Sequence, residues 1–177
     1  MGRGEEESGI KIMNKEDFIR LYLRPKVTIW FCEPIFKYDI GIIVRERGVT
    51  LDEVGSYYCP WYYNVGTRQE LNARFEDILG DSQARAVMVR DVESKIESKS
   101  HQIQQYIKDF QGKTEKSLYP FPIATDITFN KSLVLDGNKT LVALYQSWGK
   151  DKVIPVAEIY GSNLISILPD FCVVYRS

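Results

Sequence analysis

The sequence contains a single histidine, His101, and this scarcity restricts the chemistry that the chain can perform. His101 lies in a polar stretch between Ser100 and Gln102, so we expect it to be exposed. Histidine is the residue most often used as a general base and as a metal ligand. The sequence therefore argues against a histidine-based site, and any general base is expected to be a carboxylate. The carboxylates considered for this role are Asp136, Asp126, Asp91 and Glu158.

Cysteine is also scarce, with Cys32, Cys59 and Cys172 spread widely along the chain. An odd number at these spacings gives neither a disulfide framework nor a zinc-binding pattern. We expect buried thiols in a reducing compartment.

Long apolar runs are missing as well. No segment approaches the run of about 18 apolar residues that a membrane helix needs. The N-terminus is acidic and rich in glycine, with no apolar segment behind it. We therefore expect no signal peptide, a mobile tail over residues 1–13, no membrane partner and a cytoplasmic protein.

Net charge is nearly absent, because 23 Lys and Arg residues face 24 Asp and Glu residues. A neutral chain has no general field to attract nucleic acid. DNA or RNA binding would therefore need a local basic stripe beside aromatic side chains. The stripe that the sequence offers consists of Arg68, Arg74, Arg85, Arg90, Lys95 and Lys99.

A chain of 177 residues with 44% apolar content can form one domain with a substantial core. Strand and helix patterns alternate loosely along it. We predict an α+β fold, in which a single domain holds a mixed sheet flanked by helices.

The first half of the chain carries several local signals. Asn14 is a good N-cap for a helix that Pro25 ends, and residues 27–32 and 40–44 have strand composition, with a break near Gly48. The aromatic residues of segment 55–66 are expected to form a packed loop, although such rings can also stack nucleobases. Thr67 and Glu70 form a capping box for a helix that stops at Gly80.

The second half begins with a strand over residues 84–90. Residues 93–110 have helical spacing and are expected to split near residues 98–100, with a serine capping the second piece. Residues 121–126 have two prolines at their start, Pro120 and Pro122, and are predicted to form an edge strand. Residues 153–160 are predicted to be another strand, and residues 171–175 a last one.

Segment 132–146 is the most informative part of the sequence, because it predicts a buried strand that turns through Asp136 and Gly137 directly into a helix. Asn138 is a good N-cap, and the first amides of a helix are unpaired and positively polarised. Such a tip suits an anion, usually a phosphate. Asp-Gly-Asn is also common turn chemistry, and many strand-to-helix connections bind nothing.

The order of elements between residues 84 and 161 resembles the fold shared by the ParB N-terminal domain, sulfiredoxin and the free-serine kinases. The matching stretches are Pro122-Ile123, the segment 136–140, Ala143 and Ile154-Pro155. On this resemblance, residues 84–177 form a ParB/sulfiredoxin-like core and residues 14–83 form an N-terminal extension of helices and strands.

Two positions depart from the family pattern. Thr140 stands where the family has an arginine, and Asn138 stands where sulfiredoxin has its reactive cysteine. Repair of sulfinic acids by that route is therefore excluded. Lys139 keeps one positive charge near the expected phosphates, as a flexible point charge rather than a planar fork. Arg90 resembles an arginine that sulfiredoxin-like members place near the phosphates.

The resemblance implies a protein that binds ATP or CTP with Mg²⁺ and hydrolyses the nucleotide or transfers a phosphoryl group. Asp136 and Lys139 would be catalytic, with Asp136 also the metal ligand. The nucleotide would be bound by Arg90, Gly137, Asn138, Lys139 and Thr140. Two alternatives are a Mg²⁺-dependent nuclease or DNA-binding accessory protein of a plasmid or mobile element, and an inactive module that binds or inhibits another protein.

Overall fold

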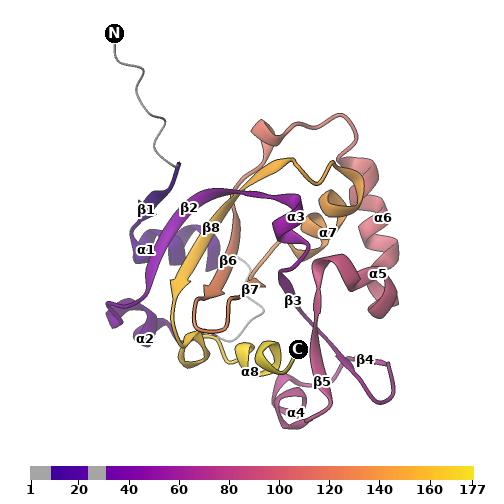
Figure 1. Cartoon of the computed structure of the whole chain (residues 1–177), viewed down its shortest axis with the longest axis horizontal. Helices are drawn as coiled ribbons and strands as arrows, with labels where there is room; N and C mark the ends of the chain where they lie inside the picture. The colour runs from indigo at the N-terminus through magenta and orange to yellow at the C-terminus, as the bar shows by residue number, and fades with distance from the viewer. Residues whose placement is uncertain (1–8, 24–30) are drawn as a thin grey trace.

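The computed structural model describes residues 9–23 and 31–177, and a mixed sheet of eight strands forms its centre (Figure 1). The strands are β1 (Lys11–Met13), β2 (Ile43–Thr50), β3 (Tyr58–Asn64), β4 (Glu70–Leu71), β5 (Ala84–Met88), β6 (Phe121–Asp126), β7 (Lys131–Val134) and β8 (Val153–Gly161). Their order is β1-β2-β8-β6-β7-β3-β4, and β5 also pairs with β3. The pairs β6–β8 and β3–β7 are parallel and the others are antiparallel, so the sheet is mixed as predicted.

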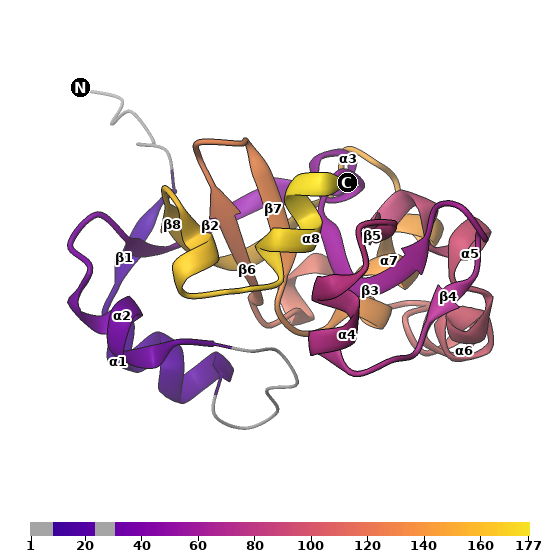
Figure 2. The ribbon, with the colours of Figure 1, turned by 90° about the horizontal axis from the view of Figure 1, so that it is seen from below.

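Helices cover the sheet on both faces. They are α1 (Lys15–Phe18), α2 (Glu33–Tyr38), α3 (Leu51–Val54), α4 (Phe75–Gly80), α5 (Val92–Lys95), α6 (Ser100–Asp109), α7 (Asn138–Ser147) and α8 (Phe171–Arg176). A π-helix, η1 (Ile19–Leu23), continues α1, and short 3₁₀ segments are η2 (Val89–Asp91), η3 (Glu97–Lys99), η4 (Glu115–Ser117) and η5 (Leu164–Ser166). Figure 2 shows α1 and α2 at one end of the molecule and α5 and α6 at the other. The fold is a single α+β domain, as the sequence predicted.

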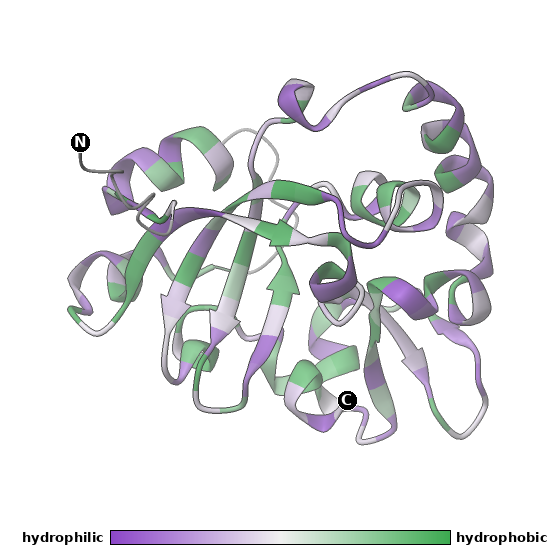
Figure 3. Ribbon diagram, turned by 45° about the horizontal axis from the view of Figure 1, so that its top comes forward, coloured by the Kyte–Doolittle hydropathy of each residue, from purple (hydrophilic) through white to green (hydrophobic). Residues whose placement is uncertain are grey.

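Strand alternation divides the buried apolar side chains into two cores, one on each face of the sheet. In β6, Ile123 faces the core under α7 while its neighbour Ala124 faces the core under α1, α2 and α8. In β7, Val134 and Leu133 divide in the same way. Successive side chains of a strand point to opposite faces, so each central strand contributes to both cores. Figure 3 shows the apolar colouring concentrated in these central strands.

Several predictions at the N-terminal end fall outside the described residues. The tail predicted over residues 1–13 is described only from residue 9, and Lys11–Met13 pair with β2 as β1. Residues 24–30, which include Pro25 and most of the strand predicted over 27–32, are not described. Cys32 is the N-cap of α2. The helix predicted after Asn14 is confirmed, and the Asn14 side chain accepts a hydrogen bond from the Glu16 amide.

The break predicted near Gly48 is wrong, because β2 runs through it and pairs along its whole length with β8. A Cβ atom on Gly48 would lie 2.7 Å from the Val153 side chain of β8, so glycine here permits a close approach between the two strands.

The aromatic segment predicted as a loop is strand β3, with an irregularity between Cys59 and Tyr62. The capping box at Thr67 is also wrong. Asn64 Oδ1 accepts hydrogen bonds from the amides of Gly66 and Thr67, which makes a turn from β3 into β4 instead of a helix start. The helix begins only at Phe75, although it ends at Gly80 as predicted.

The split of the helical region near residues 98–100 is confirmed, but no serine side chain caps α6. Strand β6 is central rather than an edge, because β8 and β7 pair with its two sides. Its one proline, Pro122, stands where the pairing with β7 stops: the Pro122 carbonyl accepts a hydrogen bond from the Leu135 amide at 2.9 Å, and the pairing with β7 starts at Ile123. The last strand predicted over residues 171–175 is helix α8.

Candidate functional site

The connection from β7 to α7 forms the tip that the sequence singled out. Gly137 has a left-handed backbone, with φ of 78°, and is itself the N-cap of α7; the predicted N-cap, Asn138, is the first helical residue. A Cβ atom on Gly137 would lie 2.8 Å from the Phe121 ring. Glycine is therefore required here both by the backbone conformation and by the space available.

The first amides of α7 have no partner within the helix. The helical hydrogen bonds start with the Leu141 amide, which donates to the Gly137 carbonyl at 2.9 Å. Within residues 9–23 and 31–177, no protein group accepts from the amides of Asn138, Lys139 or Thr140. Three unpaired donors at the positive end of a ten-residue helix are an arrangement that can bind an anion.

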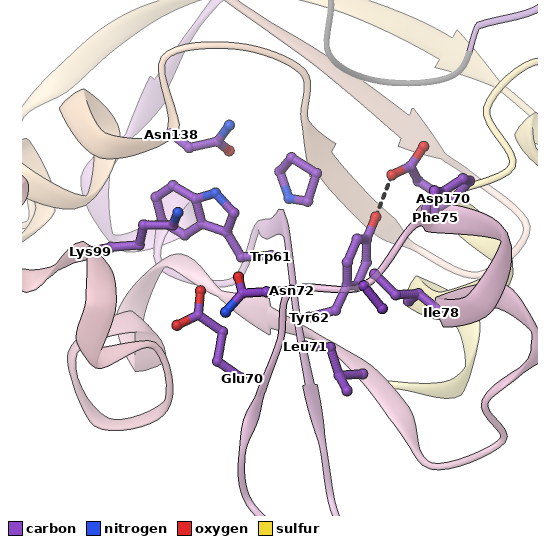
Figure 4. Close-up of a pocket in the computed structure, with 12 residues that line it drawn as sticks. Trp61, Tyr62, Glu70, Leu71, Asn72, Phe75, Ile78, Lys99, Asn138 and Asp170 are labelled. Atoms are coloured by element: carbon purple, nitrogen blue, oxygen red, sulfur yellow. Dashed lines mark hydrogen bonds between the residues drawn. The ribbon is translucent and has the colours of Figure 1, made fainter.

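A pocket of about 370 Å³ opens beside this tip (Figure 4). Asn138 lines it from α7, Lys99 from η3, and the aromatic strand β3 supplies Trp61 and Tyr62. Asp170, the residue before α8, and Glu70 of β4 add carboxyl groups. Elements that are far apart in the sequence therefore meet at the start of α7.

Two residues that line this pocket each have a buried side-chain oxygen without a hydrogen-bond partner within the described part of the chain: Asn138 Oδ1 and Asp170 Oδ2. A buried polar atom without a partner costs free energy, commonly about 1–3 kcal/mol. Both atoms belong to residues that line one pocket, and the cost would be recovered by a ligand that offers hydrogen-bond donors.

Asp170 is 2% exposed, and its Oδ1 accepts a hydrogen bond from the Tyr62 hydroxyl. Burial raises the pKa of Asp170, although the hydrogen bond from Tyr62 opposes the shift. Burial and the neighbouring Asp170 carboxyl raise the pKa of Tyr62, so its hydroxyl keeps its proton. The pocket thus contains a carboxyl group whose pKa is raised by burial.

Trp61 and Lys99 form the other side of the pocket, with Lys99 Nζ lying 5.7 Å from the centre of the Trp61 ring. Both side chains are half-buried. An indole face offers a stacking surface for a planar ring, and the ammonium group is a cation suited to a phosphate.

The sequence-predicted residues divide around this pocket. Asn138 lines it, while Lys139 and Thr140 lie half-buried in the first turn of α7. The Asp136 carboxylate accepts a hydrogen bond from the Gly137 amide at 2.7 Å and is not part of the pocket lining. Arg90 is exposed on η2, a segment that packs against α7.

Metal binding by Asp136 stays a prediction. In the part of the chain that the structure describes, no three His, Cys, Asp or Glu side chains come together as a metal site. Mg²⁺ is commonly held by one or two carboxylates together with substrate phosphates and water, so a single carboxylate is compatible with a nucleotide-borne ion.

Asp170 is a site residue that is not predicted from the sequence, because residues 171–175 are predicted to form a strand. Pro169-Asp170 before an apolar run is a helix-start signal that points to this position. Lys99 was considered only as part of the basic stripe. In the structure, Lys95 and Lys99 lie over the rings of Tyr63 and Trp61, and Arg68 and Arg74 are exposed.

No helix among the described residues is long and apolar enough to cross a membrane. No known protein family matches the chain, and neither a curated protein nor a solved structure is detectably similar to it.

Proposed function

We propose that this protein binds a nucleotide, ATP or CTP, at the start of α7. The phosphates would accept hydrogen bonds from the amides of Asn138, Lys139 and Thr140, with Lys99 and Lys139 as nearby cations. The base would stack on Trp61. The observation that carries the proposal is the start of α7, with three unpaired amides, at a pocket that Asn138 and the indole of Trp61 both line.

The Asn138 oxygen supports a base or ribose rather than a bare phosphate at that point of the pocket. An amide oxygen accepts hydrogen bonds and cannot donate one, so it suits an amino or hydroxyl group of the ligand. ATP and CTP both carry an exocyclic amino group and ribose hydroxyls. The pocket therefore offers separate partners for the phosphates and for the nucleoside.

Hydrolysis or phosphoryl transfer is the reaction that we propose for this site. Asp170, a carboxyl group that lines the pocket, would act as the general acid or base of this reaction. Mg²⁺, when bound with the nucleotide, would supply electrostatic stabilisation of the phosphate charge, with Asp136 as its protein ligand.

Isothermal titration calorimetry with ATP and CTP, with and without Mg²⁺, tests the binding. The Lys99→Gln variant should bind about tenfold more weakly, because a charge-assisted contact is lost. Lys108→Gln is the matched control, since Lys108 is an exposed lysine of the neighbouring helix α6. Failure of the folded protein to bind either nucleotide would overturn the proposal.

A further inference from the structure

A second pocket, of about 560 Å³, lies on the open part of the sheet and shares no lining residue with the pocket at α7. The face of the sheet that packs apolar side chains under α7 becomes polar towards the ends of β6 and β8. Ile123 is followed on this face by Thr125, and Val156 by Glu158 and Tyr160. The polar half is lined by charged side chains instead of being covered by a helix.

Glu158 is the centre of this polar surface and is fully buried. Its carboxylate accepts hydrogen bonds from Arg45 Nε at 2.6 Å, from Arg47 Nε at 2.9 Å and from the Thr125 hydroxyl at 2.6 Å. Burial raises the pKa of Glu158, but the hydrogen bonds from Arg47, Thr125 and Arg45 outweigh burial and hold the pKa below its ordinary value. Glu158 is therefore a charged carboxylate whose oxygens are already occupied.

The two arginines differ in how much of each guanidinium the protein uses. Arg47 donates to Glu158 through Nε and Nη2, and the same Nη2 donates to Glu53 at 2.8 Å. Arg45 donates to Glu158 only through Nε. Neither terminal amino group of Arg45 has an acceptor among the described residues.

Arg45 is also held in a fixed orientation, because its guanidinium carbon lies 3.7 Å from the centre of the Tyr160 ring. Stacking and the Nε hydrogen bond together fix the orientation of the two terminal amino groups, which have no acceptor in the described part of the chain. Arg47 and Thr125 already give both oxygens of Glu158 a hydrogen bond, so Glu158 does not need Arg45 for a structural role alone. The unused planar fork is the arrangement that binds carboxylate or phosphate groups.

Charge and surroundings agree with an anionic ligand. The lining carries three cations, Arg45, Arg47 and Lys131, against the carboxylates of Glu53 and Glu158. Lys131 Nζ donates to the Val174 carbonyl at 3.0 Å and lies over the Tyr58 ring. Apolar side chains, among them Met88 and Phe129, line the rest of the pocket.

We propose that this pocket is a second binding site, which takes a small molecule with an oxyanion head group and an apolar body. The head group, a carboxylate or a phosphate monoester, is held by the free fork of Arg45. Met88 and Phe129 contact the apolar body. The proposal is independent of nucleotide binding at α7.

Nitrogen-15 NMR titration with sodium benzoate and, separately, with inorganic phosphate tests this site. A saturable shift of the Arg45 side-chain Nε–H and the Tyr160 amide is expected for at least one probe. A saturable shift with benzoate alone would identify a carboxylate site, and a saturable shift with phosphate alone would identify a phosphate site. The amides of Asn138, Lys139 and Thr140 report the α7 pocket in the same spectra, so the two proposals succeed or fail separately.

Arg45→Gln should lower the affinity measured from the Tyr160 shift at least tenfold. Arg45→Lys should restore part of this affinity, because it keeps the charge. Arg74→Gln is the matched control, because the Arg74 side chain is 83% exposed and lies outside this pocket. The preserved spectrum of each variant shows that it is folded. The proposal is overturned if neither probe gives a saturable shift at Arg45, or if Arg45→Gln titrates like the unaltered protein.

Discussion

At the scale of single residues, Gly137 connects the fold to the proposed function, because its left-handed backbone starts α7 within van der Waals reach of Phe121. Gly137→Ala should lower the free energy of unfolding by roughly 2–4 kcal/mol, from backbone strain and from the clash with the ring. Urea denaturation followed by circular dichroism measures the loss.

Gly112→Ala is the control that separates the two causes. Gly112 also has a positive φ, of 82°, but nothing lies within 4 Å of an added Cβ atom. This variant should lose only the backbone contribution, about 1–2 kcal/mol. Equal losses in the two variants would show that Phe121 leaves room for a side chain.

Asp170 provides a prediction that depends on pH. Burial raises its pKa in the folded protein. At a pH between the ordinary aspartate pKa and the raised value, the folded state therefore holds a proton that the unfolded state has released. The contribution of Asp170 to stability should therefore fall as the pH rises from the ordinary aspartate pKa through the raised value.

The measurement compares the unaltered protein with Asp170→Asn, which cannot ionise, in urea denaturation between pH 4 and pH 8. The stability of the unaltered protein minus that of the variant should decrease with rising pH. An increase over this range would mean that the charged form of Asp170 is favoured in the fold.

Asp170 also marks the limit of what the sequence could predict at this scale. The strand-turn-helix at Asp136 and Gly137 was predictable, because the apolar run, the turn dipeptide and the helical spacing are all local. The contribution of Asp170 to the same pocket depends on α8 packing near β3, which places it against Tyr62, 108 positions away in the sequence. Local patterns contain no information about such a contact.

At the scale of elements, the pairing of β2 with β8 brings Arg45 and Arg47 to Glu158. At neutral pH, Glu158→Gln should cost roughly 3 kcal/mol, because it leaves two arginines without their shared carboxylate. The stabilisation should be lost as the pH falls through the depressed pKa of Glu158, since protonation has the same effect as the substitution.

Glu53→Gln is the matched control, because Glu53 pairs with the same Arg47 but its side chain is 42% exposed. An exposed pair contributes less, about 1 kcal/mol or below. Thermal or urea unfolding of both variants between pH 3 and pH 7 makes the comparison. A loss for Glu158→Gln no larger than that for Glu53→Gln would contradict the account of the buried cluster.

Elements with a continuous apolar pattern, such as β8 and α7, were predictable from the sequence. Elements whose local signals conflict were not predictable. The capping box at Thr67 was a valid helix signal, but Asn64 Oδ1 accepts hydrogen bonds from the amides of Gly66 and Thr67 and so forms a turn. β6 looked like an edge strand because of its prolines, and only the partners on both sides show that it is central.

At the scale of the whole molecule, the segment of residues 14–83 forms part of the same sheet as residues 84–177. β2 pairs along all of β8, and β3 joins β7 to β5. A fragment of residues 84–177 should therefore not fold by itself. In the fragment, β8 loses its partner β2, β7 and β5 lose their partner β3, and Glu158 loses its two arginines. The fragment should give a poorly dispersed NMR spectrum, and the full chain should unfold in one cooperative transition.

A well-dispersed spectrum from the fragment would instead show that the first half of the chain is an addition to an independent core. This outcome matters for function, because Trp61, Tyr62 and Glu70 reach the α7 pocket from the first half while Asn138 and Asp170 come from the second. On the present account, the pocket exists only in the full chain.

The most direct measurement of the central claim is a nitrogen-15 NMR titration of the full chain with ATP and with CTP in the presence of Mg²⁺. We predict saturable shifts of the amides of Asn138, Lys139 and Thr140 and of the Trp61 indole N–H, with at least one of the two nucleotides. The claim would be contradicted if the folded protein showed no shift at these amides with either nucleotide, or if a nucleotide bound and shifted only residues elsewhere.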